Sequence, residues 1–461
     1  MLNDELFVGK PAARLRRSAA QIIIAAVEAV DPRKAVRRVV RLRGASLWVG
    51  SRAYDLLRTR RLVVVGGGKA AAPMAAALED VLGPHIAGGL VSVKYGHTTP
   101  LSRIELVEAG HPLPDVAGQR AAEAMLQLVR EAGKDDLVLC VLSGGGSALL
   151  PAPAAGITLG EKVQATDLLL KSGATIGEVN TVRKHLSRIK GGQLAMAAAP
   201  AKLVVLVLSD VVGDRLDAIA SGPTSPDPST YVDALAIVDR YGLVSRLPSS
   251  VVTHLRQGAR GAIPETPKPG APIFRRVHPM LVGNGKVAAT AAVRKAKALG
   301  FRSLLLTTTL EGEAREAARV LLAVAREAGA AQGPVKLPAC ILAGGETTVT
   351  VRGTGKGGRC QEFALSAALA LAEWPNIVVA AFGTDGTDGP TDAAGAMVDG
   401  TTRERARALG FDLQRALDTN DAYPVFGALT DLILTGPTNT NVNDLYLVLV
   451  GSDRLPRPRA S

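Results

Sequence analysis

Cysteine is scarce in this chain, which has only three, Cys140, Cys340 and Cys360, among 461 residues. They lie far apart and form neither a CxxC pair nor, with the six histidines, the ligand spacing of a zinc site. The sequence therefore indicates no disulfide framework and no transition-metal centre. Isolated cysteines are typical of proteins from a reducing compartment, and we expect this one to be cytoplasmic.

Aromatic residues are also scarce. At 3% of the chain they leave few rings on which bases could stack, although the net charge of +12 would favour a polyanionic partner. Basic residues from Arg33 to Arg41 lie at helical spacing beside valines, which predicts an amphipathic helix with a solvated face. We expect no nucleic-acid partner, and instead a basic surface that attracts anionic metabolites.

Long hydrophobic runs are missing as well. The apolar stretch Ile22–Val27 is far too short to cross a bilayer, and the first residues do not follow the pattern of a signal peptide. We therefore expect no membrane partner. The sequence leaves open whether the protein is a monomer or a homodimer.

Apolar residues, by contrast, are plentiful. They make up 47% of the chain and the mean hydropathy is +0.19, so 461 residues can fill two hydrophobic cores. Closely spaced prolines between Pro264 and Pro272 favour extended chain over packed structure. We predict an N-terminal domain at residues 1–262, a linker at residues 263–272 and a C-terminal domain at residues 273–452.

Apolar runs alternate along the chain with stretches rich in alanine and leucine. Continuous hydrophobicity favours strands of parallel sheets that are covered on both faces, and the alternation predicts a doubly wound α/β fold. The predicted strands are Leu62–Val65, Leu137–Leu142, Leu203–Leu208, Pro279–Val282, Ser303–Thr307, Cys340–Leu342 and Ile377–Phe382. The predicted helices are Ala70–Leu82, Val116–Glu131, Glu161–Ser172, Lys286–Leu299, Glu311–Ala328 and Gln361–Ala372.

Glycine loops follow several of these strands, and ligands of an open α/β sheet bind at such strand ends. After the first predicted strand, Gly66, Gly67 and Gly68 precede Lys69. This loop has neither the Walker A spacing nor the G-x-G-x-x-G dinucleotide fingerprint. It is either an anion site at the start of a helix or a close-packed turn that carries a surface lysine.

A second glycine loop runs from Ser143 through Gly144, Gly145 and Gly146 to Ser147. Its backbone amides and two hydroxyls could surround an anionic oxygen. The G-x-S-x-G order of a serine nucleophile is absent from it. We interpret this loop as a cradle for phosphate or carboxylate.

Carboxylates follow the predicted strand at Leu203–Leu208. Asp210 and Asp214 are placed where they could hold Mg²⁺ or orient a substrate hydroxyl, and the alternative is that they cap a helix. His111 lies in the segment Gly-His-Pro-Leu-Pro-Asp, where a buried, hydrogen-bonded histidine would explain it.

The second half of the chain repeats this chemistry. Glu346 follows one strand, Arg359 ends a glycine-rich loop that leads into a helix, and Asp385 lies in Gly-Thr-Asp-Gly-Thr-Asp-Gly after the next strand. The last loop resembles a cation site but does not match an EF-hand, so turn or helix capping stays an alternative.

Eight segments taken in order resemble the glycerate 2-kinase family whose C-terminal part is called the MOFRL domain, over about residues 20–450. They are VVVGGGKAA, EAGHPLPD, LVLCVLSGGGSALLPAP, GATIGEVNTVRKHLSRIKGGQLA, LVLSDVVGD with IASGPTSPD, GGETTVTVRGTGKGGRCQE, FGTDGTDGPTDAAGA and TGPTNTNVNDL. The resemblance implies a larger N-terminal Rossmann-like domain, a smaller C-terminal α/β domain and a substrate cleft between them. It implies that Lys69 and Arg359 are active-site residues. Cys360 is a departure, because the family usually has asparagine there.

The same resemblance implies transfer of the γ-phosphoryl group of ATP to the 2-hydroxyl of D-glycerate, with Mg²⁺ as cofactor. Such transfer depends on alignment and charge neutralisation, for which lysine, arginine, Mg²⁺ and amide-rich loops suffice. We expect Lys69 and Arg359 to neutralise the phosphoryl group and the substrate carboxylate. Asp210 is the expected catalytic carboxylate and Asp214 the expected Mg²⁺ ligand, although the two could exchange these roles. The remaining expected site residues, all for binding, are Gly67, Gly68, Ser143, Gly144, Gly145, Gly146, Ser147, Glu346 and Asp385.

Two other functions stay open. Family members have often been labelled hydroxypyruvate reductases, but an NAD(P)H-dependent reductase would need the dinucleotide fingerprint that the first glycine loop lacks. A non-catalytic protein that binds glycerate is the second alternative. NADH consumption with hydroxypyruvate would identify the first, and binding without turnover would identify the second.

Overall fold

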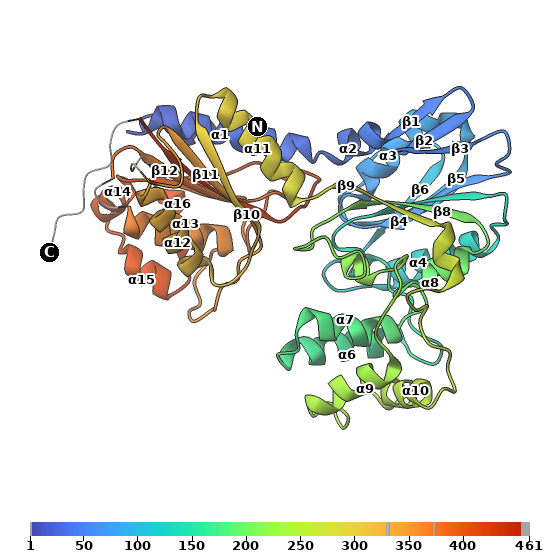
Figure 1. Cartoon of the computed structure of the whole chain (residues 1–461). Helices are drawn as coiled ribbons and strands as arrows, with labels where there is room; N and C mark the ends of the chain where they lie inside the picture. The colour runs from blue at the N-terminus through green and yellow to red at the C-terminus, as the bar shows by residue number, and fades with distance from the viewer. Residues whose placement is uncertain (1, 329, 331, 372–373, 453–461) are drawn as a thin grey trace. The chain divides into compact units, whose positions relative to one another are not determined.

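The computed structural model describes residues 2–328, 330, 332–371 and 374–452 (Figure 1). The chain divides into two compact units, one of residues 32–282 and one that joins the first 31 residues to the chain from Gly283 onward. This division differs from the linker predicted at residues 263–272. The proline-rich segment is packed, because the Pro267 carbonyl accepts a hydrogen bond from the Asp227 amide at 2.9 Å and Thr266 is only 3% exposed.

The unit of residues 32–282 contains a six-stranded sheet in the order β6-β5-β4-β7-β8-β9. Strands β4 to β8 run parallel. The chain therefore starts in the middle, adds two strands on one side and then returns to the other, which is the order of a Rossmann sheet. The strands are β4 (Leu62–Gly67), β5 (Ile86–Lys94), β6 (Ile104–Ala109), β7 (Leu137–Leu142), β8 (Lys202–Leu208) and β9 (Val277–Gly283).

Helices cover both faces of this sheet, as the doubly wound prediction requires (Figure 1). Helix α3 (Ala71–Leu82) lies on one face, and α4 (Val116–Arg130) and α8 (Gln193–Ala198) lie on the other. The strands β4, β7 and β8 are buried along almost their whole length, which explains why their apolar runs could be recognised in the sequence.

A group of four helices lies beyond α4 and α8, on the side away from the sheet, in the same unit (Figure 1). They are α6 (Leu159–Lys171), α7 (Ile176–His185), α9 (Tyr231–Arg240) and α10 (Ser249–Ala259). They enclose a core of their own, and three of them begin with capping boxes in which a threonine and an acidic residue exchange hydrogen bonds.

The basic helix predicted from Arg33 to Arg41 is correct only in its first part. Helix α2 (Pro32–Val39) ends where the alternating Val-Arg-Leu-Arg run begins strand β1 (Val40–Arg43). That strand pairs antiparallel with β2 (Ser46–Val49), which pairs with β3 (Arg52–Asp55). The alternation of period two favours a strand with one buried face, and this overrides the helical spacing of the arginines.

The second unit is built on a six-stranded mixed sheet in the order β10-β11-β15-β12-β13-β14. Only β10 and β11 pair in parallel, which corrects the expectation of a parallel sheet. The final strand lies antiparallel between β11 and β12. It is buried along its whole length, so its sequence has the same continuous apolar run as a buried parallel strand. The strands are β10 (Arg302–Leu310), β11 (Ala339–Gly345), β12 (Ile377–Gly383), β13 (Gly395–Asp399), β14 (Leu432–Ile433) and β15 (Asp444–Val450).

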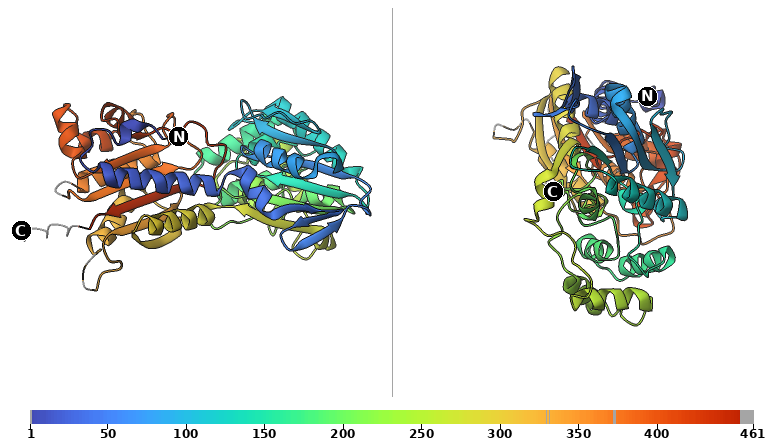
Figure 2. Two further views of the ribbon diagram at one scale, coloured as in Figure 1. Left: turned by 90° about the horizontal axis from the view of Figure 1, so that it is seen from above. Right: turned by 90° about the vertical axis from the view of Figure 1, so that its right-hand side faces the viewer.

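Helices cover this second sheet on both faces too. The N-terminal helix α1 (Ala13–Ala29) packs beside α11 (Gly285–Ala298), as Figure 2 shows, and this contact places the start of the chain in the C-terminal unit. Helices α12 (Ala314–Arg326) and α13 (Arg359–Ala370) pack on the opposite face with the core of the unit. The remaining helices are α5 (Gly146–Leu149), α14 (Thr402–Ala408), α15 (Leu413–Asp418) and α16 (Ala422–Ala428), with 3-10 turns at Asp4–Leu6, Gly83–His85, Ile219–Ser221 and Pro272–Arg276.

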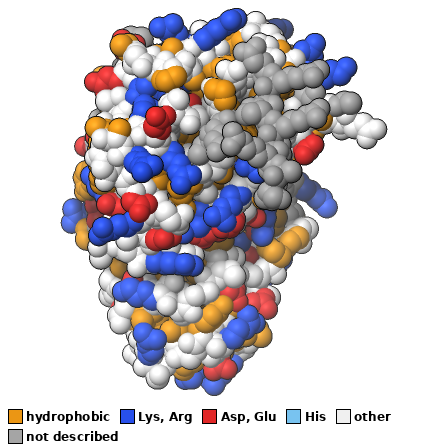
Figure 3. All heavy atoms as spheres, turned by 90° about the vertical axis from the view of Figure 1, so that its left-hand side faces the viewer, with side chains coloured by type: hydrophobic (Ala, Val, Ile, Leu, Met, Phe, Trp, Pro, Cys, Tyr) orange, Lys and Arg blue, Asp and Glu red, His pale blue; other side chains and the backbone are white. Residues whose placement is uncertain are grey.

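All seven predicted strands and all six predicted helices are confirmed, with ends shifted by a few residues. The last predicted helix ends at Ala370, and its expected end at residue 372 lies outside the described residues. No helix in the described part of the chain is both long and apolar enough to cross a bilayer. On the face drawn in Figure 3, lysine and arginine side chains are interspersed with acidic ones.

Candidate functional site

The loops after β4 and β7 meet at the carboxyl edge of the first sheet. The Lys69 amide donates to the Gly144 carbonyl at 2.8 Å, and the Ser143 amide donates to the Gly67 carbonyl at 3.3 Å. The Ser143 hydroxyl also accepts from the Ala70 amide at 3.0 Å, at the start of α3. Since β4 and β7 are the strands at which the chain changes direction across the sheet, the two glycine loops lie at its switch point.

Glycine is required in these loops because other groups approach their backbone closely. A Cβ atom on Gly68 would lie 2.2 Å from the Ser143 hydroxyl oxygen. A Cβ atom on Gly144 would lie 1.8 Å from Asp210 Oδ2, so the Asp210 carboxylate rests against this glycine. Gly145 has a φ of 83°, in the left-handed region that favours glycine. The structure therefore brings Asp210, after β8, to the loops after β4 and β7.

Replacing Gly144 by alanine should displace Asp210, because the new methyl group would occupy the place of its carboxylate. We expect kcat/KM of the reaction at this site to fall about tenfold or more, with a stability loss of about 1–3 kcal/mol from overpacking. Gly160→Ala is the control, since the nearest atom to its Cβ is 4.0 Å away. Steady-state kinetics and thermal unfolding of both variants test this prediction. Equal kinetics in the two variants would show that catalysis does not depend on the position of Asp210.

Lys69 and His111 flank Gly145. The position of a Cβ on Gly145 is 3.1 Å from Lys69 Cγ and 3.2 Å from His111 Nε2. Burial, aided by the charge of Lys69, lowers the pKa of His111 to about 4, so the imidazole is neutral at pH 7. His111 was explained in sequence as a buried histidine, and only the tertiary structure places it beside the glycine loop.

A chain of hydroxyls extends the site from Ser147. Its hydroxyl lies 2.7 Å from that of Ser221, which in turn donates to Asn180 Oδ1 at 3.0 Å. Ala220 and Ser221 have φ values of 52° and 60°, a strained conformation for non-glycine residues that is common at functional sites. The Ser147 carbonyl accepts from the ammonium group of Lys190 at 2.9 Å. The predicted site did not include Asn180, Lys190 or Ser221, although all three lie in the family-like segments.

Asp214 follows Asp210 in the same turn, where it has a φ of 55° and its amide donates to the Val211 carbonyl at 3.0 Å. Within the described residues no group of three or more His, Cys, Asp or Glu side chains could enclose a metal ion. Mg²⁺ usually takes one or two carboxylates and completes its shell with substrate phosphates and water. The oxygen donors of Asp210 and Asp214 at one strand end fit that requirement.

In the second unit, Arg359 begins α13 and is held by two carboxylates. Its Nε and Nη2 atoms donate to the two oxygens of Asp444 at 2.6 and 3.0 Å, and Nη1 donates to Glu346 at 2.6 Å. Burial raises the pKa of Asp444 to about 6, against the opposing effect of Arg359. The Asp444 carboxylate also accepts from the Tyr446 hydroxyl at 3.0 Å. Asp444 thus accepts from both Nε and Nη2 of Arg359, whose side chain is 34% exposed. Each Nη atom carries a second hydrogen that could donate to an anion.

The carboxylates of the loop after β12 serve as caps in this structure. Asp385 Oδ1 accepts from both the amide and the hydroxyl of Thr387 at 3.0 Å. Asp388 accepts from the amides of Cys360 and Gln361 at 3.0 and 2.9 Å, at the start of α13. These contacts match the capping alternative for this loop. The Cys360 thiol is fully buried, which raises its pKa well above the usual value.

The comparisons with known proteins cover both units. Residues 18–256 match a family described as a domain of unknown function (DUF4147), and residues 339–444 match the MOFRL family. The D-glycerate 2-kinase of Thermotoga maritima is 44% identical over 95% of this chain and 98% of its own, and the glycerate 2-kinase of Pyrococcus horikoshii is 42% identical with the same coverage. A crystal structure of a glycerate kinase from Thermotoga maritima has a TM-score of 0.84 at 43% identity and covers 95% of this chain and 99% of its own.

A relative from Agrobacterium vitis with 48% identity over 85% of this chain and 87% of its own is named a putative hydroxypyruvate reductase. The fold and the loop cluster at the switch point define a two-unit α/β protein with a Rossmann-type sheet that is suited to anionic ligands. With these matches over nearly the whole chain, the protein belongs to the glycerate 2-kinase family that carries a MOFRL domain.

Proposed function

We propose that the protein transfers the γ-phosphoryl group of ATP to the 2-hydroxyl of D-glycerate and releases 2-phospho-D-glycerate and ADP. The observation that carries this proposal is the convergence of Lys69, Asp210 and the loop Gly144–Gly146 at one sheet edge. Relatives named glycerate 2-kinase, 42% and 44% identical, support the choice of substrate.

The residues of the first unit divide the work by their chemistry. The ammonium group of Lys69 neutralises charge on the transferring phosphoryl group, and the amides of Gly144, Gly145 and Ser147 donate to its oxygens. The amides of Gly68, Ser143 and Gly146 donate to backbone carbonyls instead, so the expected role of Gly67, Gly68 and Ser143 is to shape the loops. Asp210 accepts a hydrogen bond from the 2-hydroxyl of glycerate and so orients the attacking oxygen. Lys69 and Asp210, which both lie against one glycine loop, can thus hold the attacking 2-hydroxyl oxygen next to the phosphoryl group.

Asp214 would hold Mg²⁺ from the same strand end, with phosphate oxygens and water as the other ligands. When bound, Mg²⁺ supplies charge neutralisation to the phosphate oxygens of ATP. Arg359, fixed by Asp444 and Glu346, supplies a second cationic group for the phosphoryl group or the glycerate carboxylate. Asp385 keeps the adjacent turn in place through its hydrogen bonds to Thr387.

Incubation with Mg-ATP and D-glycerate should give 2-phosphoglycerate, because the chain matches the glycerate 2-kinases in both units. Enolase added without phosphoglycerate mutase reads this product directly as phosphoenolpyruvate, and ³¹P NMR of the mixture identifies the ester. A signal that appears only after mutase is added would show phosphorylation at carbon 3 and refute the proposed position.

The hydroxypyruvate reductase alternative has the name of some relatives in its favour. The first glycine loop has alanine at residue 71, where the dinucleotide fingerprint has glycine or alanine, but strand β5 ends at Lys94 and not at the acidic residue that would bind the ribose of NAD. NADH with hydroxypyruvate and without ATP should therefore show no absorbance loss at 340 nm. Turnover in that assay, with none in the kinase assay, would make the protein a reductase.

A further inference from the structure

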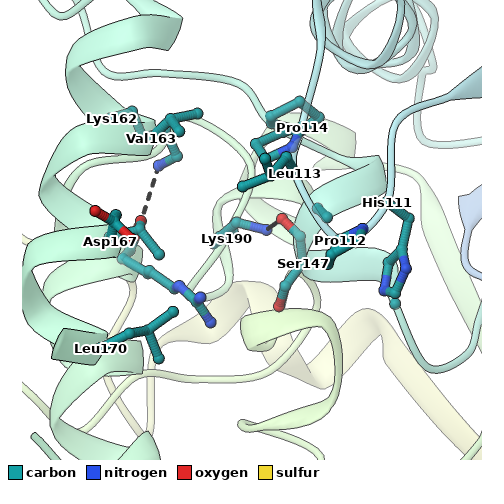
Figure 4. Close-up of a pocket in the computed structure, with 15 residues that line it drawn as sticks. His111, Pro112, Leu113, Pro114, Ser147, Lys162, Val163, Asp167, Leu170 and Lys190 are labelled. Atoms are coloured by element: carbon teal, nitrogen blue, oxygen red, sulfur yellow. Dashed lines mark hydrogen bonds between the residues drawn. The ribbon is translucent and has the colours of Figure 1, made fainter. Parts of the chain in front are cut away.

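A pocket of about 380 Å³ lies in the first unit beside the glycine loop after β7 (Figure 4). One side is formed by Gly145 and Ser147 of that loop, and the other by helices α6 and α7. Leu113 and Leu170 line the pocket with 68% and 53% of their surfaces exposed, which leaves an apolar wall open to solvent. The pocket therefore joins an apolar wall to the loop against which Lys69 lies.

Three cationic side chains from different segments line this pocket: Lys162 of α6, Arg183 of α7 and Lys190 of the following turn. Lys162 and Lys190 are only 5% and 1% exposed. Their ammonium groups donate to backbone carbonyls, Lys162 to Leu186 at 2.6 Å. Lys190 donates to Ser147 at 2.9 Å (Figure 4). Within the described residues the Arg183 guanidinium has no hydrogen-bond or ion-pair partner, and burial lowers its pKa.

The same unit shows how a buried lysine is normally compensated. Lys184, 5% exposed and one residue after Arg183, pairs with Asp227 at 3.3 Å and Asp217 at 3.6 Å. Neither Lys162 nor Lys190 has a carboxylate partner among the described residues. The fold therefore neutralises Lys184 internally, whereas no carboxylate in the described part of the chain pairs with the pocket cations.

The one carboxylate that lines the pocket within the described residues, Asp167, is directed elsewhere. It pairs with Lys171 at 2.8 Å on the outer side of α6, where its side chain is 49% exposed. Burial and the nearby charges of Lys162 and Arg183 lower the pKa of Lys190 well below the usual value, and burial lowers that of Lys162 to about 7. Burying like charges together is costly, and an anionic ligand would remove that cost.

We propose that this pocket holds ATP, with the phosphate chain on Lys162, Arg183 and Lys190 and the base and ribose on the wall of Leu113 and Leu170. This assignment rests on the proposed kinase function. A three-carbon acid is far smaller than the pocket and carries a single charge, whereas a nucleoside triphosphate offers both a polyanion and an apolar ring. The chain of phosphates would end at Gly145 and Ser147, on the loop that Lys69 flanks.

The test is calorimetric titration of the full chain with Mg²⁺ and the non-hydrolysable β,γ-imido analogue of ATP, without glycerate. Arg183→Gln should weaken binding at least about tenfold, because a charge-assisted hydrogen bond is lost. Its thermal stability should stay the same or rise, since this guanidinium has no partner in the described part of the chain. Val163→Trp, which fills the pocket from α6, should weaken binding to a similar degree without removing a charge.

Arg256→Gln on α10 is the matched control, as an exposed arginine of the same helical group outside the pocket. Unchanged analogue affinity in both Arg183→Gln and Val163→Trp would overturn the assignment. So would variants that bind the analogue normally but have a raised KM for D-glycerate, because the pocket would then hold the acid. A wild-type chain that transfers no phosphoryl group to glycerate refutes the proposed function, while the analogue titration still decides what the pocket binds.

Discussion

Replacing Lys69 by alanine should lower kcat for glycerate phosphorylation by about 10²-fold or more, since a charge aimed at the phosphoryl group acts chiefly in the transition state. The fold should survive the change. The loop is held by backbone hydrogen bonds, such as that from the Lys69 amide to the Gly144 carbonyl at 2.8 Å, and alanine keeps them. Steady-state kinetics with each substrate varied in turn, beside circular dichroism, measures the effect.

Lys134→Ala is the control for Lys69→Ala. Lys134 is exposed and precedes β7, so it lies at the opposite edge of the same sheet. Its replacement by alanine removes the same charge from the protein but leaves the loop cluster intact. We expect kcat to stay within about twofold of the wild-type value, as for most surface substitutions. An unchanged kcat in Lys69→Ala would return this lysine to the role of a surface residue on a close-packed turn.

Arg359→Lys should reduce kcat/KM substantially, by about tenfold or more, although the positive charge is kept. Lysine cannot reproduce the two hydrogen bonds at 2.6 and 3.0 Å to Asp444 while also reaching Glu346, so the cation loses its fixed position. Arg359→Ala should be worse and should also destabilise the unit by about 3 kcal/mol. That is the low end for a broken buried pair, because Arg359 is 34% exposed while Asp444 is 2% exposed.

Asp444→Asn separates the chemistry of Arg359 from its structural role. It breaks the same ion pair but leaves the arginine charge in the molecule. If Arg359 acts on the substrate, its lysine variant should lose more kcat/KM than Asp444→Asn at a temperature where both are folded. Equal losses that follow the measured stabilities would mean that Arg359 serves α13 and the buried carboxylate alone, and would remove it from the site.

The candidate site could be predicted from sequence where local chemistry and position coincide. Lys69 and Ser143–Ser147 follow strands that are buried on both faces. The continuous apolar runs of such strands allow their ends to be predicted from the sequence. Parallel strands bring their carboxyl ends to one edge, so the two loops had to be neighbours if the strands were adjacent. Asp210 follows β8, which lies beside β7, so the same topology brings it to this edge, but its contact with Gly144 is seen only in the tertiary structure.

Other features of the fold and the site could not be predicted, because they depend on which distant residues pack beside a residue and not on the residue itself. Strand β6, with polar residues in Ile-Glu-Leu-Val-Glu-Ala, lies at a sheet edge and lacks the apolar run of a central strand. The engagement of Arg359 by Asp444 joins residues 85 positions apart. Arg183 looks in sequence like any helical arginine. Only the tertiary structure shows that it lines the pocket and that no carboxylate of the described residues pairs with it.

The sequence by itself determined the α/β class, the order of strands and helices and the family, because these depend on hydrophobic periodicity and on short segments read in order. Only the tertiary structure decided which unit the first helix joins, that the second sheet is mixed, and which cations are compensated by carboxylates. The physical reason is that burial, pairing and the pKa of a group depend on neighbours supplied by distant segments. A lysine at position 184 and one at position 190 are alike in sequence, yet the fold supplies carboxylates to the first and a backbone carbonyl to the second.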